Sequence, residues 1–532
     1  MSEILLYYRR PDPTTWVYMS SFLTIGLYFV FHRFWSVRNL DILLLILLAP
    51  GLLMVHEGLR REVRELETEQ VARKLNQSPA DRTMQGDVSA QPRSAIAKGA
   101  DLNDRGSGRA MLVAQVDPKE VLDVIADELA TAPNAQEKPS VKAISEAADE
   151  VVADTRANNS AFTSRQLQRS GFVYLFVIQA IILIRLLLDP LMVRRPLLDP
   201  NLNAGGLYFI SISLFIFLMG NVVTSTPRMQ VLQGPKLGPG YALIHKLPAI
   251  TTRPVSDALA GADARDAAIL NPSEQRWSMI AKVLAILAHL AIVTGIVLIG
   301  NRHFGNLRAG VGAATLYLML PYTAQMTGRV DHALPAALLL WAILMYRKPL
   351  PAGIFFGLAA GLVYYPLFLL PLWCSFYWRR GVRRFAVGVL ATLAILMLLL
   401  SLAGTESLVD HLRLMFGIRA PIRDAADLRG IWALGWSPIW RLPVIVGFGI
   451  LCSLFAVWPS PKNLGTLISC SAAMMVAAQF WHGYGGGLYV GWFLPLLLLT
   501  IFRPNLQDRV ALKVVQAGKG EPRDSQVAAQ GA

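Results

Sequence analysis

The chain has 532 residues, of which 54% are hydrophobic and 16% are charged, and its formal net charge is +14 at pH 7. Soluble domains carry about 25% charged residues, so this composition excludes an ordinary water-soluble enzyme. Residues 57–168 hold nineteen acidic and fifteen basic side chains, a net of −4, which leaves +18 on the apolar remainder. Positive charge beside apolar segments suits an anionic membrane surface, and nucleic-acid binding is excluded as the main function.

Apolar segments long enough to cross a bilayer occur about twelve times along the chain. A spanning helix needs about 20 mostly apolar residues. The segments are Trp16–Phe34, Leu40–Val55, Gly171–Leu188, Gly206–Val223, Trp277–Gly300, Ala309–Thr327, Ala333–Tyr346, Ala352–Tyr377, Ala386–Ala403, Leu442–Trp458, Leu464–Phe480 and Leu488–Phe502. The sequence therefore predicts an all-α, polytopic membrane bundle of about twelve transmembrane helices.

The predicted spans divide the chain into four parts. Residues 1–56 hold two N-terminal spans, residues 57–168 form a polar insert, residues 169–505 hold the other spans, and residues 506–532 form a tail. The insert begins with acids and bases at helical spacing and continues with Gly, Ser, Asp and Arg. We expect it to be a cytoplasmic spacer, partly helical and partly disordered, and we expect the tail to be disordered.

Short basic loops predict the orientation in the membrane. Residues 378–384 contain four arginines and are therefore expected on the cytoplasmic side. Counting spans from this loop places both termini and the insert in the cytoplasm. The same count places residues 189–204, 301–308, 404–441 and 482–487 outside.

The first outward loop holds the densest charge beside a predicted span. Arg185 and Asp189 are four residues apart and can pair on a helix. Asp189 and Asp199 are candidate catalytic bases, because a carboxylate at the membrane rim can accept a proton from a sugar hydroxyl. Arg194 and Arg195 are candidates for holding a lipid phosphate. The alternative is that the Asp-Pro pairs cap helix ends and the arginines touch lipid headgroups.

Two later outward loops supply the other candidate substrate-binding residues. Arg419 and Arg423 precede tryptophans at four-residue steps, which would suit a sugar ring beside a phosphate. Tryptophans at this spacing also anchor interfacial helices at headgroup level. His482 and Tyr484 lie in a glycine-rich turn, where the histidine could orient a phosphate. The alternative is a tight turn whose histidine faces water.

Polar residues inside the predicted spans also have structural explanations. Arg329 and Asp331 can neutralise one another at the end of a span, and His289 can be a packing residue with satisfied hydrogen bonds. The three cysteines lie in apolar runs. No residues have metal-ligand spacing, so neither a metal nor another cofactor is expected.

The stretch from Gln325 to Phe385 carries a resemblance to a known family. It contains a Gly-Arg-Val-Asp-His turn at 328–332, an apolar helix, Arg-Lys-Pro at 347–349, a helix with glycines four residues apart, Tyr365-Pro366 and the arginine loop. This order is similar to membrane glycosyltransferases of the GT-C fold. It most resembles the polyprenyl-phosphate-mannose-dependent mannosyltransferases of glycosyltransferase family 87, although Arg329 stands where the family has Gln.

The resemblance implies transfer of a hexose, with mannose expected, from a polyprenyl-phosphate sugar to an extracytoplasmic acceptor. Asp189 or Asp199 would act as the base in the first outward loop, and His482 would contact the phosphate. The lipid-linked donor and membrane lipids are the implied partners, in a bacterial cytoplasmic membrane. Two alternatives stay open, a transporter or flippase with the mid-chain polar residues along its path, and a non-catalytic membrane scaffold.

Overall fold

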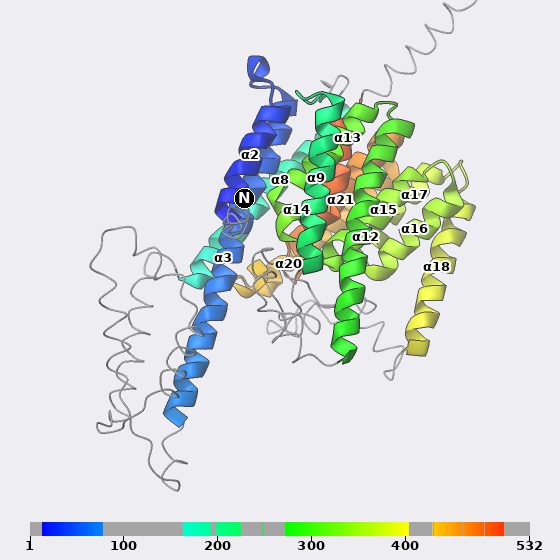
Figure 1. Cartoon of the computed structure of the whole chain (residues 1–532). Coiled ribbons are helices and arrows are strands. Elements are labelled where there is room, and N and C mark those ends of the chain that lie inside the picture. The colour runs from blue at the N-terminus through cyan, green and yellow to red at the C-terminus, as the bar shows by residue number, and fades with distance from the viewer. Residues whose placement is uncertain are drawn as a thin grey trace, which may run out of the picture. The chain divides into compact units, whose positions relative to one another are not determined.

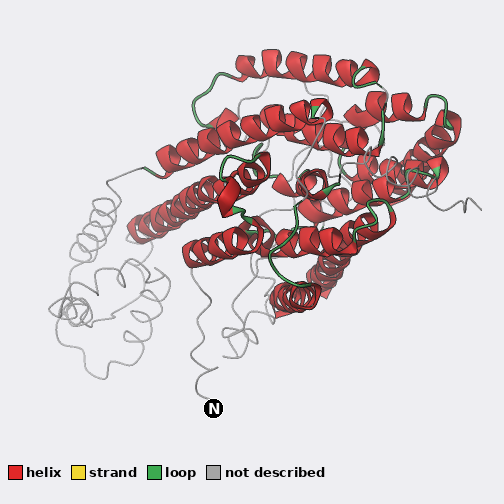
Figure 2. Cartoon of the chain, turned by 90° about the horizontal axis from the view of Figure 1, so that it is seen from above, coloured by secondary structure: helices red, strands yellow, loops and turns green. Residues whose placement is uncertain are grey.

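The computed structural model describes residues 13–77, 163–192, 198–224, 247, 272–403, 428, 430–460, 462–483 and 485–504. Within these ranges the chain forms helices joined by loops, without a strand (Figure 2). Its contacts define two compact units, Met1–Leu53 with Arg169–Ala532 and Met54–Gln168. All the sites discussed below belong to the first unit.

Figure 1 labels most of the helices of the described chain. The elements are α2 (Pro13–Tyr28), η1 (Phe31–Arg33), α3 (Val37–Gln77), α8 (Ser164–Leu188), η4 (Asp189–Leu191), α9 (Ala204–Thr224), α12 (Pro272–Arg302), α13 (Leu307–Met319), α14 (Pro321–Gln325), α15 (Val330–Leu344), α16 (Pro349–Leu362), η7 (Tyr365–Leu369), α17 (Leu370–Tyr377), α18 (Val382–Ala403), η9 (Gly430–Ala433), η10 (Pro438–Trp440), α20 (Arg441–Val457), α21 (Leu464–Trp481), η11 (Val490–Trp492) and α22 (Leu494–Phe502).

The described helices have the composition of membrane spans. Six are long and apolar enough to cross a bilayer, and five more are apolar but only 10–17 residues long. Large apolar side chains lie on outward faces, including Phe22 and Phe209, each 73% exposed, as contact with lipid requires. The prediction of an all-α integral membrane protein is confirmed, and the number of about twelve crossings stays a prediction.

The predicted single span Ala352–Tyr377 is wrong, because the chain turns back inside it. The helix α16 ends at Leu362, a 3₁₀ turn covers Tyr365–Leu369, and α17 starts at Leu370. Pro366 and Pro371 lack the backbone N–H that a continuing helix would need. Two short helices therefore replace one long one.

The glycine contacts of α16 establish the direction of this turn. A Cβ at Gly353 would collide with the carbonyl oxygen of Phe385, and a Cβ at Gly361 would collide with the side chain of Leu396. Because the residue numbers of the contacting positions increase in the same direction along both helices, α16 and α18 run parallel. Because both start at the same end of the bundle, α17 must return to that end, and the hydroxyl of Tyr377 donates to the carbonyl of Tyr346 over 2.7 Å.

Several loops therefore meet at one end of the bundle, which we call the basic end. Arg38 donates to the carbonyl of Asp199 over 2.6 Å, and Arg308 donates to the carbonyl of Pro200 over 2.9 Å. The Nε2 atom of His303 lies 2.9 Å from the carbonyl of Leu344. The arginine loop thus shares an end with residues 189–204 and 301–308, and the prediction that they lie on opposite sides is wrong.

The reversal of the chain within residues 352–377 also changes the number of times that the chain passes between the two ends of the bundle, relative to the prediction. The rings of Tyr28, at the end of α2, and Phe502, at the end of α22, pack with centroids 5.7 Å apart. The start of α2 therefore lies at the opposite end of the bundle from the end of α22. The chain ends themselves lie outside the described residues, so the expectation that both are cytoplasmic stays a prediction.

The turn between α13 and α15 lies deep in the bundle, at what we call the recessed end. His289, in the middle of α12, is 2.9 Å from the hydroxyl of Tyr317 through Nδ1 and 3.1 Å from the carbonyl of Thr327 through Nε2. It is a buried packing residue, as interpreted from the sequence. At 1.5 Å per residue the 13 residues of α13 descend about 20 Å, whereas the 31 of α12 extend about 46 Å. The helices α12 and α18 therefore continue past this turn (Figure 1).

Candidate functional site

Six buried side chains from four short elements and a loop meet at the recessed end, and we call them the aromatic–histidine cluster. They are Tyr322, His332, Tyr365, His482, Tyr489 and Trp492. The ring of Tyr489 lies 4.6 Å from His332, 4.8 Å from His482 and 4.4 Å from Trp492, measured between centroids. Tyr489 is therefore the centre of the cluster and brings together two histidines that are far apart in the sequence.

Each histidine of the cluster shares a hydrogen bond with a tyrosine. Nδ1 of His332 lies 2.5 Å from the hydroxyl of Tyr322, and Nδ1 of His482 is bonded to the hydroxyl of Tyr365. These bonds fix both imidazole rings against the aromatic walls. The sequence did not predict the tyrosines, because aromatic residues in apolar segments are typical of a hydrophobic core.

Charged groups border the cluster. Arg329 binds both carboxylate oxygens of Asp331, with distances of 2.9 Å from Nε and 2.7 Å from Nη2, so the predicted mutual neutralisation is confirmed. Trp492 Nε1 donates to the backbone carbonyl of Asp331 over 3.0 Å, which attaches the ion pair to the cluster. Arg441 donates to the carbonyl of Trp481, next to His482, over 3.0 Å.

The glycine-rich turn folds inward rather than facing water. Gly487 adopts a φ of 93°, and Gln179 donates to its carbonyl over 2.7 Å. Gln479 accepts from the amides of Gly487 and Tyr489 over 3.2 and 3.3 Å. His482 is 0% exposed, so the alternative of a histidine facing water is wrong. Burial, aided by the charges of Arg441 and His332, lowers the pKa of His482 to about 3, so its imidazole is neutral at physiological pH.

An apolar cleft ends at the cluster. It is shallow, with an enclosed volume of about 10 Å³, and lies between Leu45, Leu48, Ala49 and Leu52 of α3 and a wall formed by Leu320, Pro321, Tyr322, Val490 and Leu494. Tyr322 lines the cleft and also bonds His332.

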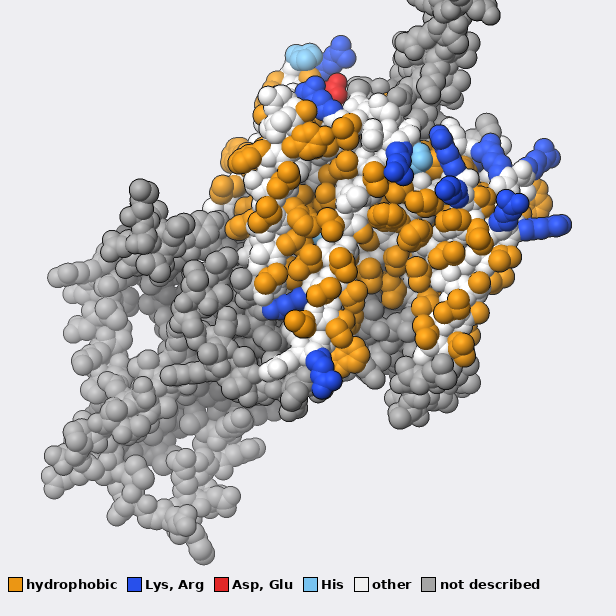
Figure 3. Space-filling model, turned by 45° about the vertical axis from the view of Figure 1, so that its right-hand side comes forward, with side chains coloured by type: hydrophobic (Ala, Val, Ile, Leu, Met, Phe, Trp, Pro, Cys, Tyr) orange, Lys and Arg blue, Asp and Glu red, His pale blue; other side chains and the backbone are white. Residues whose placement is uncertain are grey.

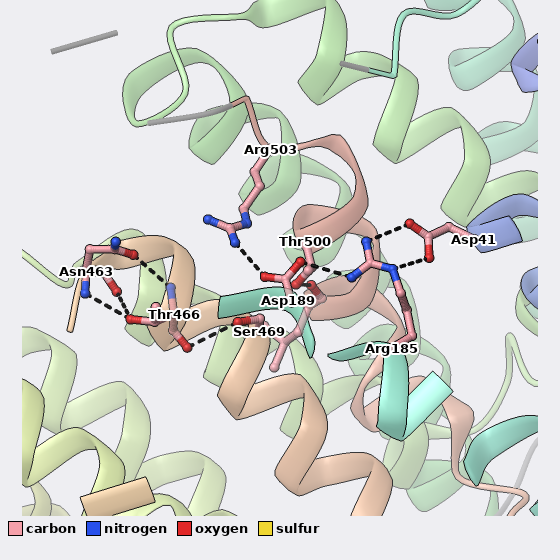
Figure 4. A network of polar contacts seen from close by, with 9 residues as sticks. Asp41, Arg185, Asp189, Asn463, Thr466, Ser469, Thr500 and Arg503 are labelled. Atoms are coloured by element: carbon pink, nitrogen blue, oxygen red, sulfur yellow. Dashed lines mark hydrogen bonds and ion pairs between the residues drawn. The ribbon is translucent and has the colours of Figure 1, made fainter. Parts of the chain in front are cut away.

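Asp189 belongs to a different group of residues at the basic end, which we call the buried ion network (Figure 4). Its Oδ1 lies 3.1 Å from Nη1 of Arg185, as predicted, and its Oδ2 lies 2.5 Å from Nη2 of Arg503. The Nε of Arg185 lies 2.9 Å from Oδ1 of Asp41. The carboxylate of Asp189 is 0% exposed, and both of its oxygens face guanidinium groups.

The structure does not bring Asp189 and His482 into one site. Gly465, at the start of α21, packs against the guanidinium of Arg503, which binds Asp189. His482 caps the other end of this 18-residue helix, about 27 Å away at 1.5 Å per residue. Asp199 is exposed at the basic end. The other candidates lie outside the described residues: Arg194, Arg195, Arg419, Arg423 and Tyr484.

The tryptophans at four-residue spacing do not form one helical face. Trp432 belongs to the 3₁₀ turn η9 and is buried, whereas Trp436 and Trp440 are 42% and 61% exposed. A second 3₁₀ turn, η10, ends at Trp440. The predicted interfacial helix is therefore absent from residues 430–440. Among the described residues, no group of three or more His, Cys, Asp or Glu side chains is placed to hold a metal ion.

Apolar helices around a buried cluster of histidine and aromatic side chains, bordered by two arginines, define an integral membrane protein with an internal polar site. Residues 272–480 match the profile of glycosyltransferase family 87. The matched region contains the whole stretch on which the resemblance was based, so the resemblance is confirmed there and indicates a membrane glycosyltransferase. Comparisons with curated proteins and with solved structures give no match.

The family match covers part of the aromatic–histidine cluster and its border, but it does not cover the buried ion network. It includes Tyr322, Arg329, Asp331, His332 and Tyr365. It excludes the buried ion network and also the turn that carries His482. At the recessed end, residues of the matched region therefore meet residues that follow it, including His482, Tyr489 and Trp492.

Proposed function

We propose that the protein transfers a hexose, with mannose as the first candidate, from a polyprenyl-phosphate sugar at the aromatic–histidine cluster. One observation carries this proposal: a shallow apolar cleft adjoins a buried polar cluster with two bordering guanidinium groups, and part of that cluster lies in the region that matches glycosyltransferase family 87. A lipid-linked sugar has the same two parts, an apolar chain and an anionic phosphate that carries the sugar.

Each part of the donor has a complementary surface in the site. The polyprenyl chain lies along the shallow cleft between α3 and Leu320, because the side chains there are apolar. The phosphate binds Arg329 and the neutral imidazole of His482, since a guanidinium can hold phosphate through two parallel hydrogen bonds. The sugar lies at the border of the cluster, since the faces of Tyr489 and Trp492 are covered by neighbouring rings.

The transfer step is a displacement with inversion at the anomeric carbon. The acceptor hydroxyl forms the new bond to this carbon while the bond to the phosphate oxygen breaks, and the lipid phosphate leaves with the bonding electrons. Arg329 exchanges its contact with Asp331 for the phosphate, and this stabilises the leaving group. The carboxylate of Asp331, released from the guanidinium, accepts the hydroxyl proton.

This assignment replaces Asp189 and Asp199 as the proposed base. Asp189 is enclosed by Arg185 and Arg503, and its position near the start of α21 separates it from His482 by the length of that helix. Asp331 is the carboxylate that borders the cluster among the described residues. We propose a stabilising role for Asp189.

We also propose the GT-C fold, about twelve helices in the membrane and a cytoplasmic basic end. The short arginine-rich loop, residues 378–384, supports this orientation. The recessed end then opens to the extracytoplasmic side, where the acceptor would be. The setting is a bacterial cytoplasmic membrane.

A transfer assay with the full chain in proteoliposomes tests the proposal. Labelled polyprenyl-phosphate mannose is offered with membrane extract as the source of acceptor, and the labelled product is counted. Asp331→Asn is expected to lower the rate at least a hundredfold, since loss of general-base catalysis costs about 10²–10⁴. Asp199→Asn, which neutralises an exposed carboxylate at the basic end, is the matched control and should transfer at the wild-type rate. Full activity in Asp331→Asn, or its loss in Asp199→Asn, would contradict the proposed base.

A further inference from the structure

The basic end carries a dense group of exposed cations, which we call the cationic face. Its members are Arg302, Arg347, Lys348, Arg379, Arg380, Arg383 and Arg384. Figure 3 shows Lys and Arg side chains gathered at this end, above a belt of hydrophobic side chains. Residues 276–403 contain a single carboxylate, Asp331, and it is paired at the recessed end. Carboxylates of this region therefore do not neutralise the cationic face.

Two loops of the cationic face are held together by packing. Tyr377 bonds the carbonyl of Tyr346, and a Cβ at Gly381 would meet Pro349 at 3.0 Å. Gly381 adopts a φ of 108°, a conformation that favours glycine. Packing of the two loops therefore fixes the positions of their arginines relative to α18. This packing is needed because the like charges of the arginines repel one another.

An apolar stripe continues from the cationic face along the outside of α18. Below Arg383, which is exposed, the side chains of Val387, Leu390 and Leu398 are 59%, 66% and 59% exposed. Their spacing of about one or two helical turns puts them on one face. Trp378 is 71% exposed at the upper border, where tryptophan favours the boundary between headgroups and hydrocarbon. The outside of α18 thus combines a cationic head with an apolar flank.

We propose that this surface is a binding site for anionic phospholipid, with the headgroup phosphate at Arg383 and Arg384 and the acyl chains along α18. A soluble polyanion would satisfy the arginines but would leave Val387 and Leu390 uncovered. A zwitterionic lipid would cover the flank, but its own cation would be repelled by the arginines. An anionic phospholipid matches both parts, and each Lys or Arg near such a lipid surface contributes to the attraction.

The test measures lipid binding rather than transfer, so its outcome does not depend on the proposed function. The full chain in neutral detergent is titrated with dioleoylphosphatidylglycerol, dioleoylphosphatidylcholine or inorganic phosphate, and bound lipid is counted by native mass spectrometry. Phosphatidylglycerol is expected to bind at least tenfold more tightly than phosphatidylcholine. The double variant Arg383→Gln/Arg384→Gln should reduce this preference about tenfold or more, because roughly one factor of five is lost with each cation.

Two control variants make the result decisive. Arg383→Lys/Arg384→Lys retains both charges and should retain most of the preference, which also shows that the site tolerates substitution. Arg276→Gln/Lys282→Gln removes two cations near the start of α12, away from the cationic face, and should bind phosphatidylglycerol as the wild type does. Equal binding of the two lipids, an unchanged preference in the Gln variant, or displacement of the lipid by millimolar inorganic phosphate would each overturn the proposal.

Discussion

Substitution of Asp189 separates a stabilising role from a catalytic one. The buried ion network contains two carboxylates and two guanidinium groups and has no net charge. The side chain of Asp189 is 0% exposed, and Asp189→Leu leaves the guanidinium of Arg503 beside it without a counter-ion. Loss of one partner of a buried pair costs about 3–5 kcal/mol. Because Arg185 keeps Asp41, one guanidinium loses its partner, and we expect a loss of about 3 kcal/mol in the free energy of unfolding.

The double variant gives the stronger test. Arg503→Met alone leaves an excess carboxylate and should also cost about 3 kcal/mol, whereas Asp189→Leu with Arg503→Met restores neutrality. Replacement of a whole buried pair by apolar side chains is often neutral. The double variant should therefore lose at most about 3 kcal/mol, rather than the roughly 6 kcal/mol sum of the single losses, a coupling of about 3 kcal/mol.

The assay is unfolding of the purified protein in mixed micelles by titration with sodium dodecyl sulfate, followed by tryptophan fluorescence. Single losses that simply add would refute the pairing of Asp189 with Arg503. The folded double variant is then used in the transfer assay. Transfer at a rate near that of the wild type supports a stabilising role, and its complete loss would mean that Asp189 takes part in the chemistry.

Three further predictions concern packing, topology and pH. Gly353→Val should force α16 away from the carbonyl of its neighbour and cost about 1–3 kcal/mol, whereas Gly220→Val, which has open space, should unfold like the wild type in the same titration. Single cysteines at Asp199 and Arg380 should react with an impermeant maleimide from the same side of sealed vesicles; labelling from opposite sides would contradict the fold-back. Since the pKa of His482 falls from 6.5 to about 3, the unfolded chain binds more protons between these values, and stability should decrease as pH falls below about 6.5. His482→Asn removes one of the buried histidines and should therefore lessen this dependence in unfolding measured at pH 7 and pH 5.

Hydropathy predicted where most helices lie but not how often the chain reverses. Every predicted span contains a described helix, because apolar length is what a bilayer selects. In Ala352–Tyr377 the two antiparallel helices have the same apolar composition, so no change of hydropathy marks the reversal. Pro366 and Pro371 were the available signals, and their effect on a helix depends on whether neighbours satisfy the freed backbone groups.

The sequence identified several polar residues of the sites but not their partners. Arg185 and Asp189 are four residues apart, and their pairing was predicted correctly. Arg503, the other partner of Asp189, lies 314 residues away, and no local pattern connects such positions. His482 was selected for its glycine-rich turn, yet Tyr365 and Tyr489, which hold it, look like core residues until the fold brings them together.

The aromatic–histidine cluster joins residues from both sides of the boundary at residue 480, where the family match stops. Tyr322 and His332 precede this boundary, and Tyr489 and Trp492 follow it. A polypeptide shortened to the matched region would keep the ion pair of Arg329 but lose the ring at the centre of the cluster. Swapping the matched portion between homologous proteins should consequently yield hybrids whose activity depends on taking residues 481–504 from the same parent.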